Sequence, residues 1–175
     1  MRILYSLFVP IFALTLLSAC TTNSISTAFD DSRNESLARK RIEASHPAFQ
    51  DAHFDVTSFD GIVLITGQVS SADIIPIATS QVKPLRNVRK VHNELTVAGT
   101  TSVISRTNDS WLTTKTKSAL SASDKADASR IKVVTENGVV YMMGLLTRAE
   151  ADAAVEITRQ IQGVQKIVKV FEYIN

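Results

Sequence analysis

Side chains that could perform chemistry are few and scattered in this 175-residue sequence. Cys20 is the only cysteine, so an internal disulfide is excluded. The three histidines lack the short spacing of a metal site, and Asp124 and Asp127 lack the remaining ligands of a calcium loop. No glycine-rich phosphate loop and no G-x-S-x-G nucleophile motif is present. The sequence therefore predicts a protein that is not an enzyme and has neither a metal site nor a cofactor.

The N-terminal segment has the layout of a lipoprotein signal. One charged residue, Arg2, precedes an apolar run of about 15 residues, which is shorter than the ~20 that a membrane-spanning helix needs. The run ends in Leu17-Ser18-Ala19-Cys20, which resembles the bacterial lipobox, whose cysteine receives fatty acyl groups such as palmitate. We therefore expect a signal peptide over residues 1–19, acylation of Cys20 and a polar tether over residues 20–29. The alternative is an ordinary signal peptide that is cut elsewhere and leaves a free thiol.

The residues after the cysteine indicate a location and exclude one class of partner. In Gram-negative lipoproteins an Asp directly after the cysteine commonly retains the protein in the inner membrane, so Thr21 predicts the outer membrane, with the body in the periplasm. The chain has 19 Lys plus Arg and 17 Asp plus Glu, and cleavage before Cys20 removes Arg2, which leaves 18 against 17. A nearly neutral body in that compartment does not predict nucleic-acid binding, which depends on phosphate contacts from a basic surface.

The mature sequence contains an internal repeat. A shift of 77 residues places Asp60-Gly61 over Asn137-Gly138 and Gly67 over Gly144, with apolar residues between them in both copies. The same shift pairs residues 54–56 with 131–133 and residues 70–73 with 147–150. Such a period indicates two copies of one small domain in tandem. We expect these copies at residues 30–98 and 108–175, with a linker over residues 99–107.

Each copy is predicted to run helix, strand, strand, helix, strand. Asp60-Gly61 and Asn137-Gly138 are two-residue turn signals between apolar segments, which indicates an antiparallel hairpin in each copy. The last strand of the second copy is expected over residues 164–174, where apolar residues alternate after Gly163.

Capping patterns and prolines predict where the helices begin and end. A hydroxyl residue stands three residues before a carboxylate in three places, which are Ser32/Glu35, Ser70/Asp73 and Thr147/Glu150. The first helix of each copy is expected from about residue 34 to before Pro47, and from about residue 111 to 120. The second helix of the second copy is expected over residues 149–161. Its counterpart contains Pro76 and Pro84, which predict a shorter or irregular helix.

These features together resemble the BON domain, a small αββαβ module often found in pairs in periplasmic proteins. The resemblance covers roughly residues 35–98 and 108–175, and segments 108–115 and 135–145 carry it most closely. It implies an α+β fold of two tandem BON domains, each with a three-stranded mixed sheet packed against two helices. It also implies an outer-membrane lipoprotein that binds anionic phospholipid through its second BON domain and supports envelope integrity.

The candidate lipid-binding residues lie on the first helix of the second copy and are Trp111, Leu112, Lys115 and Ser118. Helical spacing places Leu112 on the stripe that faces the sheet, whereas Trp111, Lys115 and Ser118 lie on its border. Tryptophan favours the headgroup region of a membrane, and lysine is attracted to an anionic surface. The alternative is that Trp111 packs against the first copy. The 77-residue shift places Trp111 over Asn34, so the first copy has no matching aromatic residue.

Two further interpretations stay open at this point. The chain could be a periplasmic adaptor that docks onto outer-membrane assembly proteins or a cell-wall enzyme, using its anchor only for location. The basic run Arg39-Lys40-Arg41 could contact a membrane or a partner, although a charged run is more often a solvated helix face.

Overall fold

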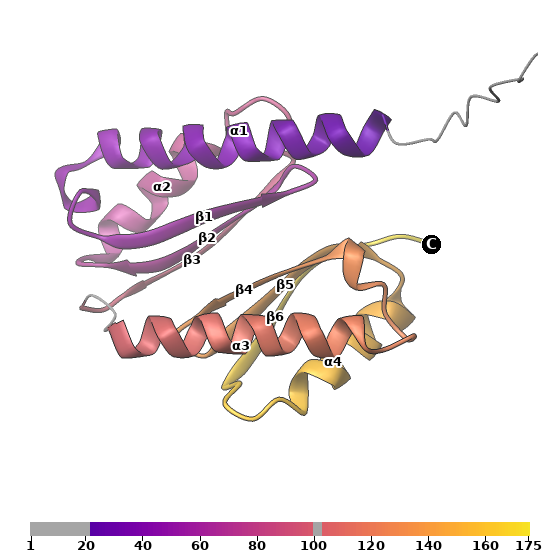
Figure 1. The fold of residues 1–175 in the computed structure, drawn as a ribbon. Coiled ribbons are helices and arrows are strands. Elements are labelled where there is room, and N and C mark those ends of the chain that lie inside the picture. Colours follow the sequence, from indigo (N-terminus) through magenta and orange to yellow (C-terminus); the bar gives the residue numbers. More distant parts are fainter. Residues whose placement is uncertain (1–21, 100–102) are drawn as a thin grey trace, which may run out of the picture.

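The computed structural model describes residues 22–99 and 103–175, so the signal segment and Cys20 lie outside the described residues. The first repeat contains α1 (Thr22–Ser45), β1 (His53–Phe59), β2 (Ile62–Val69), α2 (Ile75–Val82) and β3 (Lys90–Val97). The second repeat contains α3 (Val103–Ser121), β4 (Ile131–Glu136), β5 (Val139–Leu146), α4 (Arg148–Arg159) and β6 (Lys166–Tyr173). Both repeats thus have the predicted order of elements (Figure 1).

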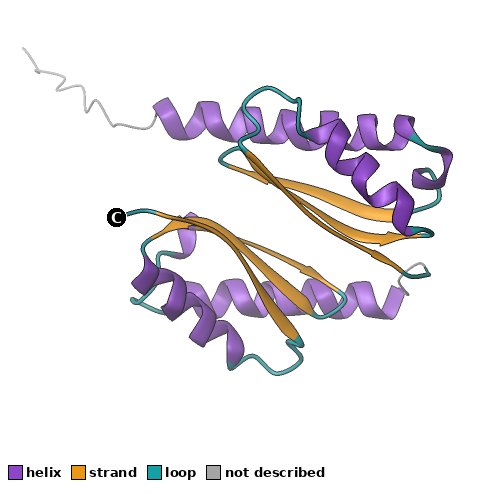
Figure 2. Ribbon diagram, turned by 180° about the vertical axis from the view of Figure 1, so that it is seen from behind, coloured by secondary structure: helices purple, strands orange, loops and turns teal. Residues whose placement is uncertain are grey.

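Each repeat forms one three-stranded mixed sheet. The central strand β2 pairs antiparallel with β1 and parallel with β3, and β5 pairs in the same way with β4 and β6. The parallel pairs are possible because α2 and α4 return the chain to the end of the sheet at which the central strand begins, so that the last strand runs in the same direction. The two helices of each repeat cover one face of its sheet (Figure 2), where Ile42 of α1 and Val82 of α2 pack with Val63 of β2. The predicted α+β fold is confirmed.

The turn of each hairpin requires left-handed backbone at both of its residues. Asp60 and Gly61 have φ of 50° and 74°, and Asn137 and Gly138 have φ of 49° and 73°. This combination is the type I′ turn that matches the twist of two antiparallel strands. The hairpin prediction is confirmed in both repeats.

A carboxylate on the preceding helix, buried in the second repeat and partly buried in the first, holds each turn. Asn137 and Gly138 both donate their backbone N–H groups to Asp109 of α3, at 2.8 Å each. In the first repeat, Asp31 of α1 accepts the N–H groups of Asp60 and Gly61 at 2.6 and 3.0 Å. Buried backbone donors need such partners, so this contact joins the helix to the hairpin in each repeat.

Gly138→Val should destabilise the second repeat by about 1–3 kcal/mol, because a β-branched residue is strained at positive φ. A side chain at Gly138 would also meet the end of the Gln165 side chain at 2.9 Å, but that side chain can move. At Gly61 the obstacle is the backbone oxygen of Asn87 at 2.4 Å, so Gly61→Val should cost more. Urea unfolding checks both variants, and a midpoint unchanged in Gly138→Val would contradict the argument.

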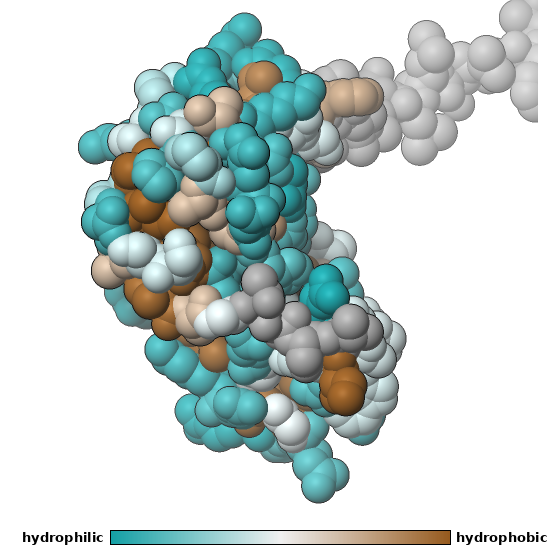
Figure 3. Space-filling view, turned by 90° about the vertical axis from the view of Figure 1, so that its left-hand side faces the viewer, coloured by the Kyte–Doolittle hydropathy of each residue, from teal (hydrophilic) through white to brown (hydrophobic). Residues whose placement is uncertain are grey.

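The first helix of each repeat begins earlier than the sequence predicts. α1 starts at Thr22, so residues 22–29 are helical rather than a tether, and α3 starts at Val103 within the predicted linker. The predicted capping box at Ser32 and Glu35 is therefore wrong, because both residues lie inside α1. The upper part of Figure 3, where α1 lies, is mostly hydrophilic. None of the helices in residues 22–99 and 103–175 is long and apolar enough to span a membrane.

The second helices differ as the prolines predict. α4 has 12 residues and a complete capping box between Thr147 and Glu150, whose hydrogen bonds hold the pKa of the Glu150 carboxyl below its usual value. α2 has only 8 residues, carries a proline in its first turn and follows a short 3-10 helix over Ala72–Ile74. The Ser70/Asp73 capping box is wrong, because Ser71 is the N-cap of that 3-10 helix and makes no side-chain capping bond.

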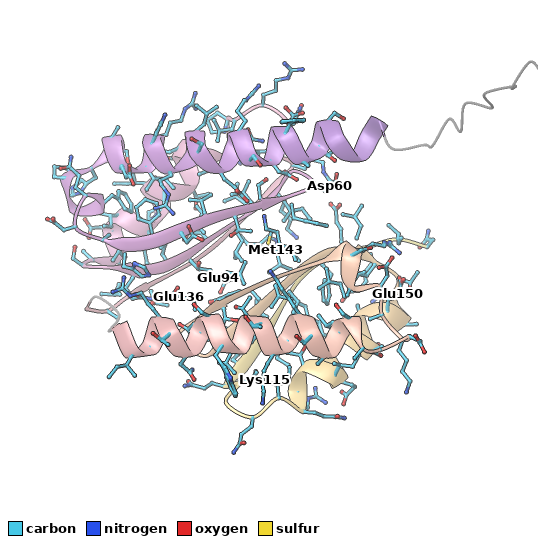
Figure 4. The ribbon with its side chains drawn as sticks, in the orientation of Figure 1. Asp60, Glu94, Lys115, Glu136, Met143 and Glu150 are labelled. Carbon is cyan, nitrogen blue, oxygen red and sulfur yellow. The ribbon has the colours of Figure 1, made fainter. Side chains whose placement is uncertain are left out.

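The two sheets face each other, with the helices on the outer sides (Figure 1). Five buried side chains form a core between the sheets, namely Ile62, Leu64, Tyr141, Met143 and Val170. Met143 lies between the two sheets in Figure 4, together with Glu94 and Glu136. Burial, assisted by these two carboxylates, raises the pKa of the Tyr141 hydroxyl to about 12. Tyr141 is therefore neutral in this interface at physiological pH.

Polar contacts surround this core between the sheets. Lys132 donates to Glu35 at 2.9 Å, Gln68 donates to Glu136 at 2.6 Å, and Arg89 pairs with Glu172 at 2.6 Å. Each contact joins one repeat to the other, so the contacts set the relative position of the two sheets. Glu35, predicted as a capping residue, instead accepts hydrogen bonds from the Ser58 backbone and from Lys132.

Candidate functional site

Trp111 lies on the outer side of α3, away from the first repeat. Its side chain is 47 % exposed, and the Lys115 ammonium lies 4.3 Å from the centre of its ring system. Figure 4 shows Lys115 pointing to the side of α3 that faces away from both sheets. A cation over an indole face is attracted by the ring electrons. The alternative that Trp111 packs against the first repeat is wrong.

A shallow groove of about 480 Å³ runs beside the indole. α3 lines one side with Trp111, Lys115 and Ser118, and residues 160–162 after α4 line the other. Gly163 permits this close packing, because a Cβ there would lie 3.2 Å from Leu112 and 3.9 Å from Trp111. The structure therefore brings three of the four candidate residues to one groove of the second repeat.

Leu112, the fourth candidate residue, does not belong to the surface. Its side chain is fully buried, because it lies on the face of α3 that packs toward the sheet and α4. Its inclusion among residues that touch lipid is corrected on this ground. Leu112 instead supports α3 from below, beside the exposed Trp111.

The sequence reasoning missed Ile104, which is 83 % exposed on the first turn of α3. Ile104 precedes Trp111 by seven residues, and at about 100° per residue this spacing puts both on the same side of the helix. The seven-residue spacing between Ile104 and Trp111 could have been recognised in the sequence, but residues 99–107 were predicted to form a linker rather than part of a helix. Ile104, Trp111, Lys115 and Ser118 form what we call the α3 stripe.

The charges of α3 are unevenly distributed. Its one acidic side chain, Asp109, is buried against the hairpin turn, whereas Arg106, Lys115 and Lys117 are exposed. Among the described residues, none of these three cations forms an ion pair with a carboxylate. Lys115 is the one of these cations that lies beside Trp111, whereas Arg106 lines a different groove with His53 and Asp55 of the first repeat.

Comparison with known proteins identifies the repeated unit. Residues 30–99 and 108–175 each match the BON domain model. The chain belongs to the BON domain family. The two matches coincide with the two units of the structure, so the first repeat is the first BON domain and the second repeat is the second BON domain.

Three relatives are similar over most of their length. The outer membrane lipoprotein DolP of Haemophilus influenzae is 36 % identical over 85 % of this chain and 77 % of its own. The 21 kDa hemolysin of Actinobacillus pleuropneumoniae is 32 % identical over 87 % and 78 %, and the osmotically-inducible protein Y of Escherichia coli is 26 % identical over 83 % and 73 %. The first relative agrees with the predicted dual-BON type and with the predicted lipid-anchored location in the outer membrane.

The two BON domains also meet at a larger cleft of about 600 Å³. Its charged side chains include Asp31, Glu35, Arg130 and Lys132, and each already has a partner within the protein. Asp31 holds the hairpin turn, Glu35 pairs with Lys132, and Arg130 pairs with Glu150 at 3.2 Å. The cleft is thus occupied with contacts that stabilise the fold. Within residues 22–99 and 103–175, no group of three His, Cys, Asp or Glu side chains is arranged to hold a metal ion.

The structure changes the alignment of the two first helices. Asp31 and Asp109 hold equivalent turns, and the buried residues Asn34 and Ala38 match the buried Leu112 and Thr116. This correspondence is a shift of 78 residues, one more than the shift that aligns the hairpins. Trp111 therefore corresponds to Arg33 rather than to Asn34. Arg33 is exposed, as Trp111 is.

Proposed function

We propose that this chain is a non-enzymatic lipoprotein of the outer membrane, facing the periplasm, whose second BON domain binds anionic phospholipid through the α3 stripe. Through this binding the protein supports envelope integrity. Acylation of Cys20 anchors the chain, since stable anchoring takes two membrane-binding signals and a lipoprotein cysteine carries more than one acyl chain.

One observation carries the proposal, the exposed indole of Trp111 with the Lys115 ammonium over it. Burying an indole between headgroups is favourable because its ring is apolar while its N–H can still donate a hydrogen bond. Lys115 has no carboxylate partner among the described residues, so it is free to pair with a lipid phosphate. Exposed Ile104 extends the apolar contact along the same side of α3.

Trp111→Glu should fold normally and lower partition onto anionic vesicles by about tenfold or more, because it removes the indole and adds charge repulsion. Lys115→Ala removes one attraction and should cost about fivefold. Flotation of the body from residue 21 onward with phosphatidylglycerol vesicles measures both losses. Added salt should weaken wild-type binding, because it screens charges beyond about 8 Å at physiological ionic strength.

Tyr173→Glu is the matched control, because Tyr173 is 45 % exposed on the same domain and is not part of the α3 stripe. This variant should bind vesicles as the wild type does. If Trp111→Glu folds and binds phosphatidylglycerol vesicles as the wild type does, lipid binding through the α3 stripe is refuted and the adaptor interpretation is favoured. If Trp111→Glu unfolds the domain, the indole is a structural residue.

A further inference from the structure

α1 carries equal numbers of acidic and basic side chains, but the fold separates them. The four acidic residues all have partners in the first BON domain or at its border. Asp31 and Glu35 accept backbone N–H groups of the β1–β2 hairpin, Asp30 accepts from Asn87, and Glu43 lies 3.9 Å from Arg39. Asp30, Asp31 and Glu35 are thus engaged with the β1–β2 hairpin and the turn at Asn87, whereas Glu43 is half-exposed and contacts only Arg39 of its own helix.

Three of the four basic residues of α1 are left on the outside. Arg39 pairs with Asp55 and lies 5.2 Å above the Phe54 ring, so it belongs to the fold. Arg33, Lys40 and Arg41 are exposed, and none of them pairs with a carboxylate among the described residues. Within the basic run of residues 39–41, Arg39 therefore contacts other residues of the first BON domain, whereas Lys40 and Arg41 are exposed to solvent.

An exposed aromatic residue accompanies these cations. Phe29 is 74 % exposed and lies nine residues before the buried Ala38, which places it on the opposite side of α1 at about 100° per residue. Arg33 and Lys40 lie within about 40° of Phe29 around the helix by the same geometry. We call Phe29, Arg33 and Lys40 the α1 outer face. An apolar ring among unpaired cations makes no contribution to the core of the domain.

The α1 outer face and the α3 stripe occupy equivalent places in the two BON domains. With the shift of 78 residues that aligns the two helices, Arg33 corresponds to Trp111 and Lys40 corresponds to Ser118. Because the two sheets face each other and the helices lie outside, these surfaces point to opposite sides of the molecule (Figure 1). A single flat membrane cannot contact both of them at once.

We propose that the α1 outer face is a second binding surface for anionic phospholipid, so that the protein can bridge two anionic membrane surfaces. The charge complements lipid phosphate, and Phe29 lies only nine positions in sequence after Cys20, the proposed acylation site. That second argument rests on the anchoring in the proposed function. Binding by the α1 outer face is separable from binding by the α3 stripe.

The test uses the body from residue 21 onward, which contains every helix and strand that the structure describes. In the Trp111→Glu background, this body should still float with phosphatidylglycerol vesicles and not with phosphatidylcholine vesicles. Adding Arg33→Glu and Lys40→Glu should lower the remaining partition by about 30-fold or more, because two attractions are reversed. Lys83→Glu with Lys125→Glu is the matched control, since both lysines are exposed and unpaired among the described residues.

Bridging provides a second measurement. Wild-type body should aggregate phosphatidylglycerol vesicles, seen as turbidity, whereas Trp111→Glu alone and Arg33→Glu/Lys40→Glu alone should each float without aggregating them. The proposal is overturned if Trp111→Glu alone abolishes flotation, or if Arg33→Glu/Lys40→Glu aggregates vesicles as the wild type does. If Trp111→Glu binds as the wild type does while Arg33→Glu/Lys40→Glu loses all binding, the α1 outer face stands and the proposed α3 site fails.

Discussion

Replacing Asp109 by Ala should lower the free energy of unfolding of the second BON domain by about 3 kcal/mol, through two lost charge-assisted hydrogen bonds. The carboxylate is 5 % exposed and accepts the N–H groups of Asn137 and Gly138 at 2.8 Å each. With alanine, the Gly138 donor stays buried without a partner, and an unmade buried hydrogen bond costs more than a formed one contributes. Trp111 is the only tryptophan, so its fluorescence during urea unfolding reports on this domain.

Two further variants make the result specific to the turn. Asp109→Asn keeps one acceptor oxygen and should lose less stability than Asp109→Ala. Asp31→Ala removes the equivalent carboxylate, which also accepts the Ser58 hydroxyl at 2.6 Å, and should destabilise the first domain by a similar amount. If Asp109→Ala unfolds at the same urea concentration as the wild type, the hairpin turn forms without the contact to α3.

Cys20→Ser should abolish anchoring in the outer membrane. Serine has no thiol to accept a diacylglyceryl group, so the chain should remain uncleaved or be released from the outer-membrane fraction. Fractionation of cell envelopes followed by detection of the protein measures this outcome. Ser18→Ala is the control, because alanine keeps a small residue within the proposed lipobox. A Cys20→Ser protein that is processed and fractionates unchanged would refute the lipoprotein interpretation.

Local sequence signals were sufficient wherever a short segment determines its own structure. The Asp60-Gly61 and Asn137-Gly138 turns follow from residues that tolerate positive φ, and the structure confirms both. The capping box of Thr147 and Glu150 was also readable, because both partners lie within one helical turn. The repeat placed these signals in two copies, which predicted the order of elements, whereas the mixed sheet was implied by the resemblance to the BON domain.

Candidate surface residues could be predicted only in part. The helical spacing correctly placed Trp111 and Lys115 off the buried stripe, since that spacing is a property of any α-helix. Ile104 was missed because the Gly-, Thr- and Ser-rich segment around it predicted a linker rather than the first turn of α3. The same pattern that predicted a helix start at Ser32 and Glu35 was misleading, because Glu35 bonds to a strand and to the other domain instead.

The packing of the two domains and the charge of their outer surfaces depend on contacts between distant residues. Ile62 and Met143 are ordinary apolar strand residues in sequence, and only the folded chain shows that they meet between two sheets. Likewise, α1 has no net charge along its sequence, yet Glu35 turns inward to Lys132, 97 positions away, while Arg33 and Lys40 remain exposed. The charge of a side chain depends on the residue type alone. The direction in which that side chain points depends on contacts with residues that are distant in the sequence.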